Sequence, residues 1–232
     1  MKNLFYLFVS VVFIGCAAEE ELISYGLVIG NDGNEYQTVI IGSQEWMAEN
    51  LRTTTYSNGD SIPNITSTAQ WYDNLTSGAW AHYNNDSQYE IPYGKLYNWY
   101  AVNDSRNACP TGWHVPSEAE TEVLRDYLGG FQVAGGKMKT TDVGLLGSWA
   151  SPNVDASNTS GFSGVPGGLR AGDGDRSMGE SGKWWTSTAY DGGVINPTVD
   201  RAIGFSLSAD TGEMLGLNGT QAGGISVRCV KD

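Results

Sequence analysis

The chain has few basic residues and very few histidines. Among its 232 residues, 13 lysines and arginines stand against 26 aspartates and glutamates, which gives a formal net charge of −13, and there are only two histidines. Binding to nucleic acid needs a basic face to meet the phosphates, so this composition argues against a nucleic-acid partner. We interpret the acidic balance as that of a solvated surface.

The sequence also lacks the common catalytic motifs. It has no HExxH, CxxC or GxSxG pattern, and Gly136-Lys137 has neither the upstream glycine nor the following serine or threonine of a phosphate-binding loop. The isolated histidines, His82 and His114, are a poor basis for a metal site. We therefore predict that the protein is not an enzyme. The alternative within the enzyme class is a glycoside hydrolase with two loop carboxylates, but no acid pair shows the separation that this mechanism needs.

The apolar run Leu4–Ile14 is too short to cross a bilayer and is typical of a signal peptide. The residues up to Cys16 resemble the lipobox of bacterial lipoproteins, and the acidic stretch that follows resembles the surface-export signals of Bacteroides-type bacteria. We expect residues 1–15 to be removed as a lipoprotein signal peptide. Cys16 would then carry the lipid, and residues 16–24 would tether the protein to the cell envelope, at the outer membrane surface. The alternative is an ordinary cleaved signal with an incidental Cys16.

Only three cysteines are present. If Cys16 carries lipid, Cys109 and Cys229 remain to form a disulfide in the oxidising setting of an exported protein. Such a bridge would join the two ends of the domain and stabilise it by about 4 to 5 kcal/mol in the chain-entropy model. The alternative is a pair of buried free thiols.

Glycine and aromatic residues are abundant. Thirty-one glycines, eight tryptophans and twelve tyrosines favour a loop-rich, strand-biased fold over a helical bundle. Two β-rich runs flank the turn signal Asn31–Asn34 and predict a hairpin. The expected strands are Ser24–Ile29, Glu35–Ile41, Gln44–Met47, Lys183–Tyr190, Arg201–Ser208, Met214–Leu217 and Gly224–Val230.

One amphipathic helix is clearly marked in the sequence. Ser117 is a candidate N-cap, and Glu120 three residues later completes a capping box. We expect the helix to end at Gly129-Gly130 and to bury one apolar face. The residues expected on that face are Ala119, Val123, Leu124, Tyr127 and Leu128.

Several short blocks, in the same order along the chain, resemble one protein family. They include Gly33–Val39, Trp46–Leu51, Tyr97–Tyr100, Gly112–Ser117, Trp185–Thr188 and Ser226–Cys229. With these blocks the chain resembles the Fibrobacter succinogenes major paralogous domain family, whose members are mostly exported or surface proteins. This family is similar to C-type-lectin-like folds.

The resemblance implies an α+β domain over residues 25–232. The expected C-type-lectin-like fold has small twisted antiparallel sheets, two helices, and long loops over one end. A bridge to the last strand recurs in such domains and fits Cys109–Cys229. The similar formylglycine-generating enzymes need a reactive cysteine pair, and because both downstream cysteines are assigned to the bridge, that activity is not expected here.

Three carboxylates in a glycine-rich stretch are candidates for calcium binding. Asp173, Asp175 and Glu180 lie where lectin-like domains build their ion sites, and oxygen ligands on a loop suit a hard cation. The EPN, QPD and WND triplets of calcium-dependent sugar binders are absent, however, and Asp-Gly-Asp is also common in turns without metal. We expect no cofactor, with Ca²⁺ as the alternative.

The tryptophans divide into two groups by position. Those within the family blocks are expected in the core, namely Trp46, Trp99, Trp113 and Trp185, whereas Trp71, Trp80, Trp149 and Trp184 are expected at the surface. The expected binding face comprises residues 149–185 with the turn region 191–200. Its candidate ligand-binding residues are Trp149, Arg176, Trp184 and Tyr190. Arg170 and Arg228 are expected in internal ion pairs.

Together these features predict a surface-exposed lipoprotein whose lectin-like domain binds a glycan or a protein ligand without turnover. The membrane would be contacted through the lipid anchor only. The main alternative is a structural or assembly component of the cell envelope, in which the aromatic residues pack against other envelope components.

Overall fold

The computed structural model of the chain describes residues 23–73, 76–191 and 200–232. The predicted signal peptide, Cys16 and most of the tether lie outside these residues, as does most of the turn region 191–200. Within the described ranges, no helix combines the length and apolar character needed to span a membrane.

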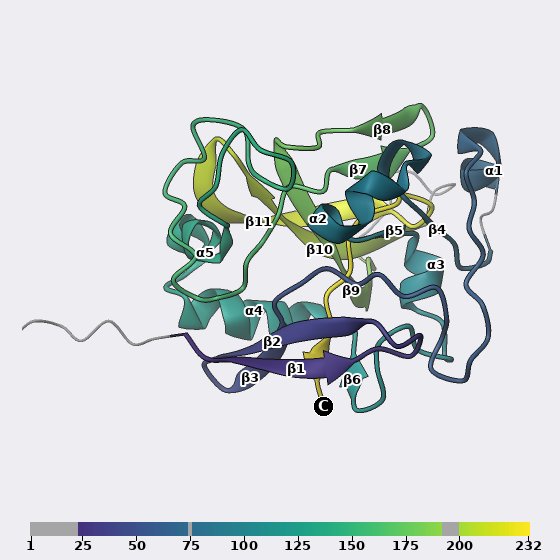
Figure 1. Cartoon of the computed structure of the whole chain (residues 1–232), viewed down its shortest axis with the longest axis horizontal. Coiled ribbons are helices and arrows are strands. Elements are labelled where there is room, and N and C mark those ends of the chain that lie inside the picture. Colours follow the sequence, from purple (N-terminus) through teal and green to yellow (C-terminus); the bar gives the residue numbers. More distant parts are fainter. Residues whose placement is uncertain (1–22, 74–75, 192–199) are drawn as a thin grey trace, which may run out of the picture.

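The fold combines small antiparallel sheets with a few helices (Figure 1). The largest sheet has the order β1-β2-β3-β12-β6, and the next has the order β11-β10-β9. The first contains β1 (Tyr25–Ile29), β2 (Glu35–Ile41), β3 (Gln44–Met47), β12 (Val230–Lys231) and β6 (Trp113–His114). The second contains β9 (Ser181–Ala189), β10 (Arg201–Ser208) and β11 (Thr211–Thr220). Two further pairs are β4 (Trp80–Ala81) with β5 (Leu96–Tyr97), and β7 (Leu169–Ala171) with β8 (Gly174–Arg176).

Two helices are longer than the other α-helices of the described residues. They are α4 (Glu118–Tyr127) and α5 (Phe131–Met138), joined by the predicted Gly129-Gly130. Shorter helices are α1 (Thr68–Asp73), α2 (Glu90–Tyr93) and α3 (Trp99–Val102), with 3-10 turns at Tyr83–Asn85 and Ser87–Tyr89. The helix α4 lies between the two main sheets (Figure 1), because Gln44 of β3 donates to its Glu120 carbonyl at 3.0 Å and its Glu118 N–H donates to Thr188 Oγ1 of β9 at 2.9 Å.

Three clusters of buried side chains form the core, and the two larger ones cover both faces of the three-stranded sheet. Trp185 belongs to one cluster, and its neighbour Trp184 belongs to the other. The tryptophans predicted in the core are confirmed there: Trp46, Trp99, Trp113 and Trp185 are all at most 6% exposed. The predicted disulfide between Cys109 and Cys229 is also present, within the first cluster.

The capping box of α4 is confirmed, but its predicted buried face is wrong in part. The Ser117 hydroxyl accepts from the Glu120 N–H, and the Glu120 carboxylate accepts from the Ser117 N–H. Leu124 and Leu128 are buried as expected, yet Ala119 is exposed, and Val123 and Tyr127 are 49% and 65% exposed. The helix instead buries Thr121, whose hydroxyl is satisfied by the Glu118 carbonyl at 2.7 Å. Because its hydroxyl is hydrogen-bonded, Thr121 can occupy a buried position on the helix, where the amphipathic pattern had predicted apolar residues.

His114 of β6 connects α4 to the C-terminal strand and gives a pH-dependent prediction. Its ring nitrogens lie 2.8 Å from Glu120 Oε1 and 2.7 Å from Asp232 Oδ1. Burial lowers the pKa of His114, but the two carboxylates outweigh it and raise the pKa above 6.5. A raised folded-state pKa means that the ion pairs stabilise fully below about pH 6.5 and lose this effect as pH rises through the folded-state value. Because the ring is partly exposed, we expect at most about 1 kcal/mol.

The measurement compares thermal unfolding of the native chain and His114→Gln between pH 5 and pH 8. The difference in melting midpoint should be largest at pH 5 and should shrink toward pH 8. A difference that stays constant across this range would contradict the ion-pair account and would leave only a packing role for the ring.

Candidate functional site

The predicted ion-binding carboxylates are distributed over the β7–β8 hairpin and its surroundings. Asp175 is paired with Arg170 at 3.0 Å and also accepts from the Asn84 N–H at 2.6 Å. Asp173 is paired with Arg176 at 2.9 Å. Over the described part of the chain, no group of three or more His, Cys, Asp or Glu side chains is placed to hold a metal ion. Two of the three predicted ligands, Asp173 and Asp175, are therefore paired with arginines, and the three carboxylates do not form a cation-binding group.

The two arginines expected in internal ion pairs differ from one another. Arg170 is buried and paired with Asp175, as predicted. Arg228 donates instead to Asn50 Oδ1 at 2.8 Å and to the carbonyls of Phe162 and Ser163, so an ion pair is not what holds it. Burial without a paired carboxylate lowers the pKa of Arg228 to about 9.

The surface positions predicted for Trp149 and Trp184 are wrong, since both rings are 0% exposed. Trp184 stacks on Phe205 with ring centroids 5.2 Å apart, and Trp149 donates its indole N–H to the Gly164 carbonyl at 2.9 Å. Trp71 is likewise buried, while Trp80 is half-buried. The alternation argument failed for Trp184 because the sheet that carries it is covered on both faces. A fully buried ring has no face left to stack on a sugar.

Of the predicted ligand-binding residues, Arg176 and Tyr190 do reach the surface. Arg176 is exposed in the β7–β8 hairpin, where it pairs with Asp173. Tyr190 is half-buried and follows the last residue of β9. The other aromatic residues in the described part of the proposed face, Trp149, Phe162, Trp184 and Trp185, are buried.

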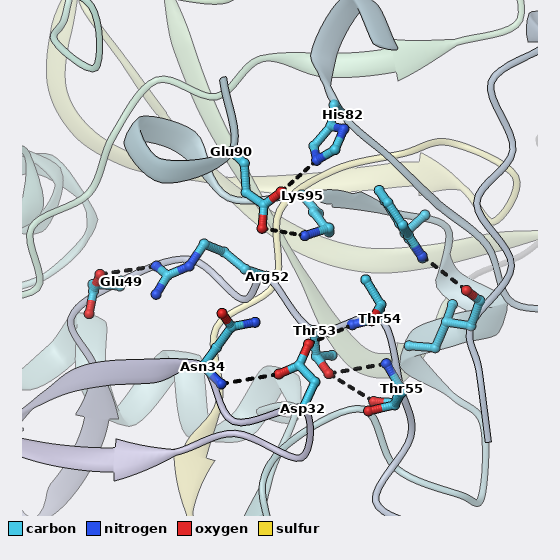
Figure 2. Close-up of polar contacts among 12 residues, drawn as sticks. Asp32, Asn34, Glu49, Arg52, Thr53, Thr54, Thr55, His82, Glu90 and Lys95 are labelled. Atoms are coloured by element: carbon cyan, nitrogen blue, oxygen red, sulfur yellow. Dashed lines mark hydrogen bonds and ion pairs between the residues drawn. The ribbon is translucent and has the colours of Figure 1, made fainter. Parts of the chain in front are cut away.

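A group of polar side chains lies where the β1–β2 turn meets α2 (Figure 2). Glu90 accepts from Lys95 Nζ at 2.5 Å and lies 2.7 Å from His82 Nε2. Arg52 pairs with Glu49 at 3.0 Å. Burial lowers the pKa of Lys95, although Glu90 opposes this. Arg52 also donates to the Glu35 carbonyl at 2.8 Å, and the Thr54 N–H donates to Asp32 at 3.0 Å. We therefore interpret the cluster as a structural link between the hairpin and the loops, and not as a binding site.

A groove between α4 and the β10–β11 pair is the better candidate for a ligand. It has a volume of about 250 Å³. Its wall is formed by α4, its floor by the two strands, and Tyr190 lies at its border. The lining residues are Glu118, Thr121, Glu122, Arg125, Tyr190, Ile203, Gly204, Phe205, Met214, Leu215, Gly216, Leu217 and Asn218.

The groove owes its depth to Gly216. In the register of the sheet, Gly216 lies opposite Phe205 and Asn218 lies opposite Ile203, so these positions share one face. A Cβ atom at Gly216 would meet no other atom within 4 Å. A side chain can therefore start from this position toward the groove, and the native glycine leaves that space open.

The groove combines an apolar floor with a charged wall. Ile203 and Met214 supply aliphatic surface beside the ring of Phe205. Glu118 and Glu122 supply carboxylates from one side of α4, where Arg125 pairs with Glu122 at 3.4 Å. This arrangement can take an apolar side chain in the floor and a basic or amide group along the wall. Apart from Tyr190, no sequence pattern pointed to this groove, because the predicted strands and helix did not indicate which of their faces meet.

A family model described as the Fibrobacter succinogenes major domain matches residues 39–231. The match spans all residues of the groove, the two cysteines of the disulfide and the capped helix α4. It begins within β2, so β1 precedes it. Comparison with the curated proteins and with the solved structures gave no match.

Proposed function

Since this chain belongs to the Fibrobacter succinogenes major domain family, we propose that it is a non-catalytic binding protein of the cell surface, with a C-type-lectin-like fold. The small antiparallel sheets, the helices α4 and α5, and the disulfide to the last strand support this fold. The ligand is a protein or a glycan, held without turnover and without a cofactor.

The groove over Gly216 carries the proposal, and its chemistry favours a protein ligand over a glycan. Sugar binding commonly uses exposed flat rings, and the tryptophans expected for that purpose, Trp149 and Trp184, are buried. The floor contains Ile203, Met214 and the ring of Phe205, which is only 2% exposed, and the half-buried Tyr190 lies at its border. A volume of about 250 Å³ fits one or two apolar side chains of an extended polypeptide better than a sugar ring with its hydroxyl groups.

Anchoring by lipid at Cys16 is the second part of the proposal and has its own test. The apolar run Leu4–Ile14 and the cysteine after it support export and acylation. Expression in a bacterium with a lipoprotein pathway should place the native chain in the membrane fraction. A Cys16→Ser variant should lose the membrane association, and equal partitioning of the two would overturn the anchor.

Filling the groove should abolish ligand binding while leaving the fold intact. We expect peptides selected from a displayed random heptapeptide library against the native chain to carry an apolar residue. Their affinity for Gly216→Leu should fall at least tenfold, because the new side chain occupies the floor. The matched control is Thr141→Leu, which adds the same side chain at an exposed position outside the groove and should leave the affinity unchanged.

The outcomes separate the candidate functions. Peptides that bind the native chain and lose affinity for Gly216→Leu support the protein-binding proposal. A glycan array that gives binding sensitive to Gly216→Leu, with no such peptide, would move the assignment to a glycan. If neither library yields a ligand that depends on the groove, the binding proposal fails and the envelope-assembly role replaces it.

A further inference from the structure

The strand β1 has an open edge in the described part of the chain. It pairs with β2 on one side, in the register Tyr25↔Val39 to Ile29↔Glu35, and no described strand pairs with its other side. β1 lies at the outer border of the five-stranded sheet (Figure 1). Edge strands of soluble proteins are usually protected by charges, proline or a bulge, because free N–H and C=O groups invite another strand.

None of these protections is found in β1. Its five residues, YGLVI, carry no charge and no proline, and the pairing with β2 is regular over the whole strand. Tyr25, Leu27 and Ile29 alternate along it and are 40%, 60% and 53% exposed. Since alternate side chains of a strand point to one face, these three form an apolar stripe beside the open edge.

The hydrogen bonds of the hairpin show which backbone groups face outward. The Gly30 N–H donates to the Asn34 carbonyl at 2.7 Å, so Gly30 is bonded across the hairpin. In an antiparallel pair, residues alternate between bonding to the partner strand and facing away from it. Val28 and Gly26 therefore face β2, and the N–H and C=O groups of Tyr25, Leu27 and Ile29 face the open edge.

We infer that β1 pairs with β1 of a second copy of this chain, antiparallel, about a two-fold axis through Leu27. In that register Leu27 lies opposite Leu27 of the other copy, and Tyr25 lies opposite Ile29. Each residue whose backbone faces the open edge then lies opposite another such residue. The three pairs exchange two hydrogen bonds each, which makes six backbone hydrogen bonds. The two apolar stripes also fall on the same face and continue one another. The result is one ten-stranded antiparallel sheet shared by two copies.

A second copy suits this edge because the strand is complementary to itself. The pairing brings no charge opposite another charge, although each chain has a net charge of −13. A five-residue strand pair is small for an interface, so the dimer is weak, and repulsion between the two acidic chains weakens it further at low ionic strength. Association should therefore increase with salt, opposite to what an interface of opposite charges would show.

Cross-linking through introduced thiols tests the register. In the full chain carrying Cys16→Ser, a Leu27→Cys variant should be joined into a dimer by a short bismaleimide, because the paired Cα atoms would lie about 5.5 Å apart. Tyr25→Cys mixed with Ile29→Cys should give the same product. Tyr25→Cys alone should not, because its two thiols would lie about 14 Å apart along the strands. Ile40→Cys, at a position 71% exposed on β2, is the control for random collisions.

Sedimentation of the same chain without introduced cysteines provides the second readout. At about 0.5 M salt and rising protein concentration the native chain should dimerise, and Leu27→Lys should abolish this by placing two ammonium groups opposite each other. Ile40→Lys should have no effect. A monomeric native chain at all concentrations, a dimer that survives Leu27→Lys, or equal cross-linking at Leu27 and Ile40 would each overturn the inference. The groove over Gly216 belongs to the other main sheet, so the peptide-binding test is independent of these results.

Discussion

Replacing Asn50 with alanine is expected to lower the free energy of unfolding by about 4 kcal/mol. The Asn50 side chain is buried and makes four hydrogen bonds. Its amide donates to the Tyr93 carbonyl at 2.8 Å and to Ser226 Oγ at 3.2 Å. Its Oδ1 accepts from Trp184 Nε1 and Arg228 Nε, both at 2.8 Å.

The large effect comes from the groups that alanine would leave without a partner. The indole N–H of Trp184 and the Nε–H of Arg228 are both in the core, where water cannot replace the lost acceptor. An unpaired buried donor costs about 1 to 3 kcal/mol, and more when the group is charged. Arg228 is the charged one, and burial already lowers its pKa to about 9. The variant therefore weakens the contact between the loop after β3, the strand β9 and the last residues of the chain.

Urea unfolding at pH 7 measures this change, and Asn58→Ala is its control. Asn58 also makes two side-chain hydrogen bonds, with Asp60, but the loop is exposed and water replaces them. We expect less than about 1 kcal/mol for this control. Similar losses for the two variants would show that burial of the Asn50 network contributes nothing beyond a surface hydrogen bond.

Features set by neighbouring residues were predictable from the sequence. The bounds of β2, β3 and β10 follow from alternation and turn residues and were predicted residue for residue. The start of α4 follows from Ser117 and Glu120, which lie three positions apart and bond each other. The strand predicted over Gly224–Val230 was too long, because only Val230 and Lys231 form a ladder and the earlier residues make isolated bridges.

Features set by distant residues were not predictable in this way. Trp184 and Trp185 alternate, and alternation implies one buried and one exposed ring, but a second cluster of core residues covers the other face. On α4, apolar Val123 is exposed and Thr121 is buried, because the neighbouring strands rather than the helix decide which face is covered. The same spacing of apolar residues along α4 is compatible with burial of either face.

The groove combines three such distant features, which is why the sequence patterns did not indicate it. It needs the wall of α4, the register of β10 against β11, and the absence of a side chain at Gly216. The sequence has 31 glycines, and nothing local distinguishes Gly216 from those that serve turns. Among the described glycines, Gly216 is the one that has both a negative or extended φ and open space at the Cβ position. That combination becomes visible only once the sheet is assembled.

Removing the disulfide should destabilise the protein by about 4 to 5 kcal/mol, the largest effect that we predict. Cys109 and Cys229 are 120 residues apart, so the bridge restricts a long loop in the unfolded chain. Both cysteines are buried, and Cys229 directly precedes β12. That strand has only two residues, yet Val230 pairs with Trp46 on one side and with His114 on the other. So short a strand has few contacts of its own to keep it between β3 and β6.

The double variant Cys109→Ala/Cys229→Ala should therefore unfold at a urea concentration lower by roughly 2 M than the native chain. Reduction of the native chain should reproduce the shift, and the same reductant should leave the double variant unchanged. Equal midpoints for the native and double-variant chains would mean that packing of β12 alone holds the C-terminal strand. In that case the groove, whose strands connect to β12 through residues 221–229, would keep its geometry without the bridge.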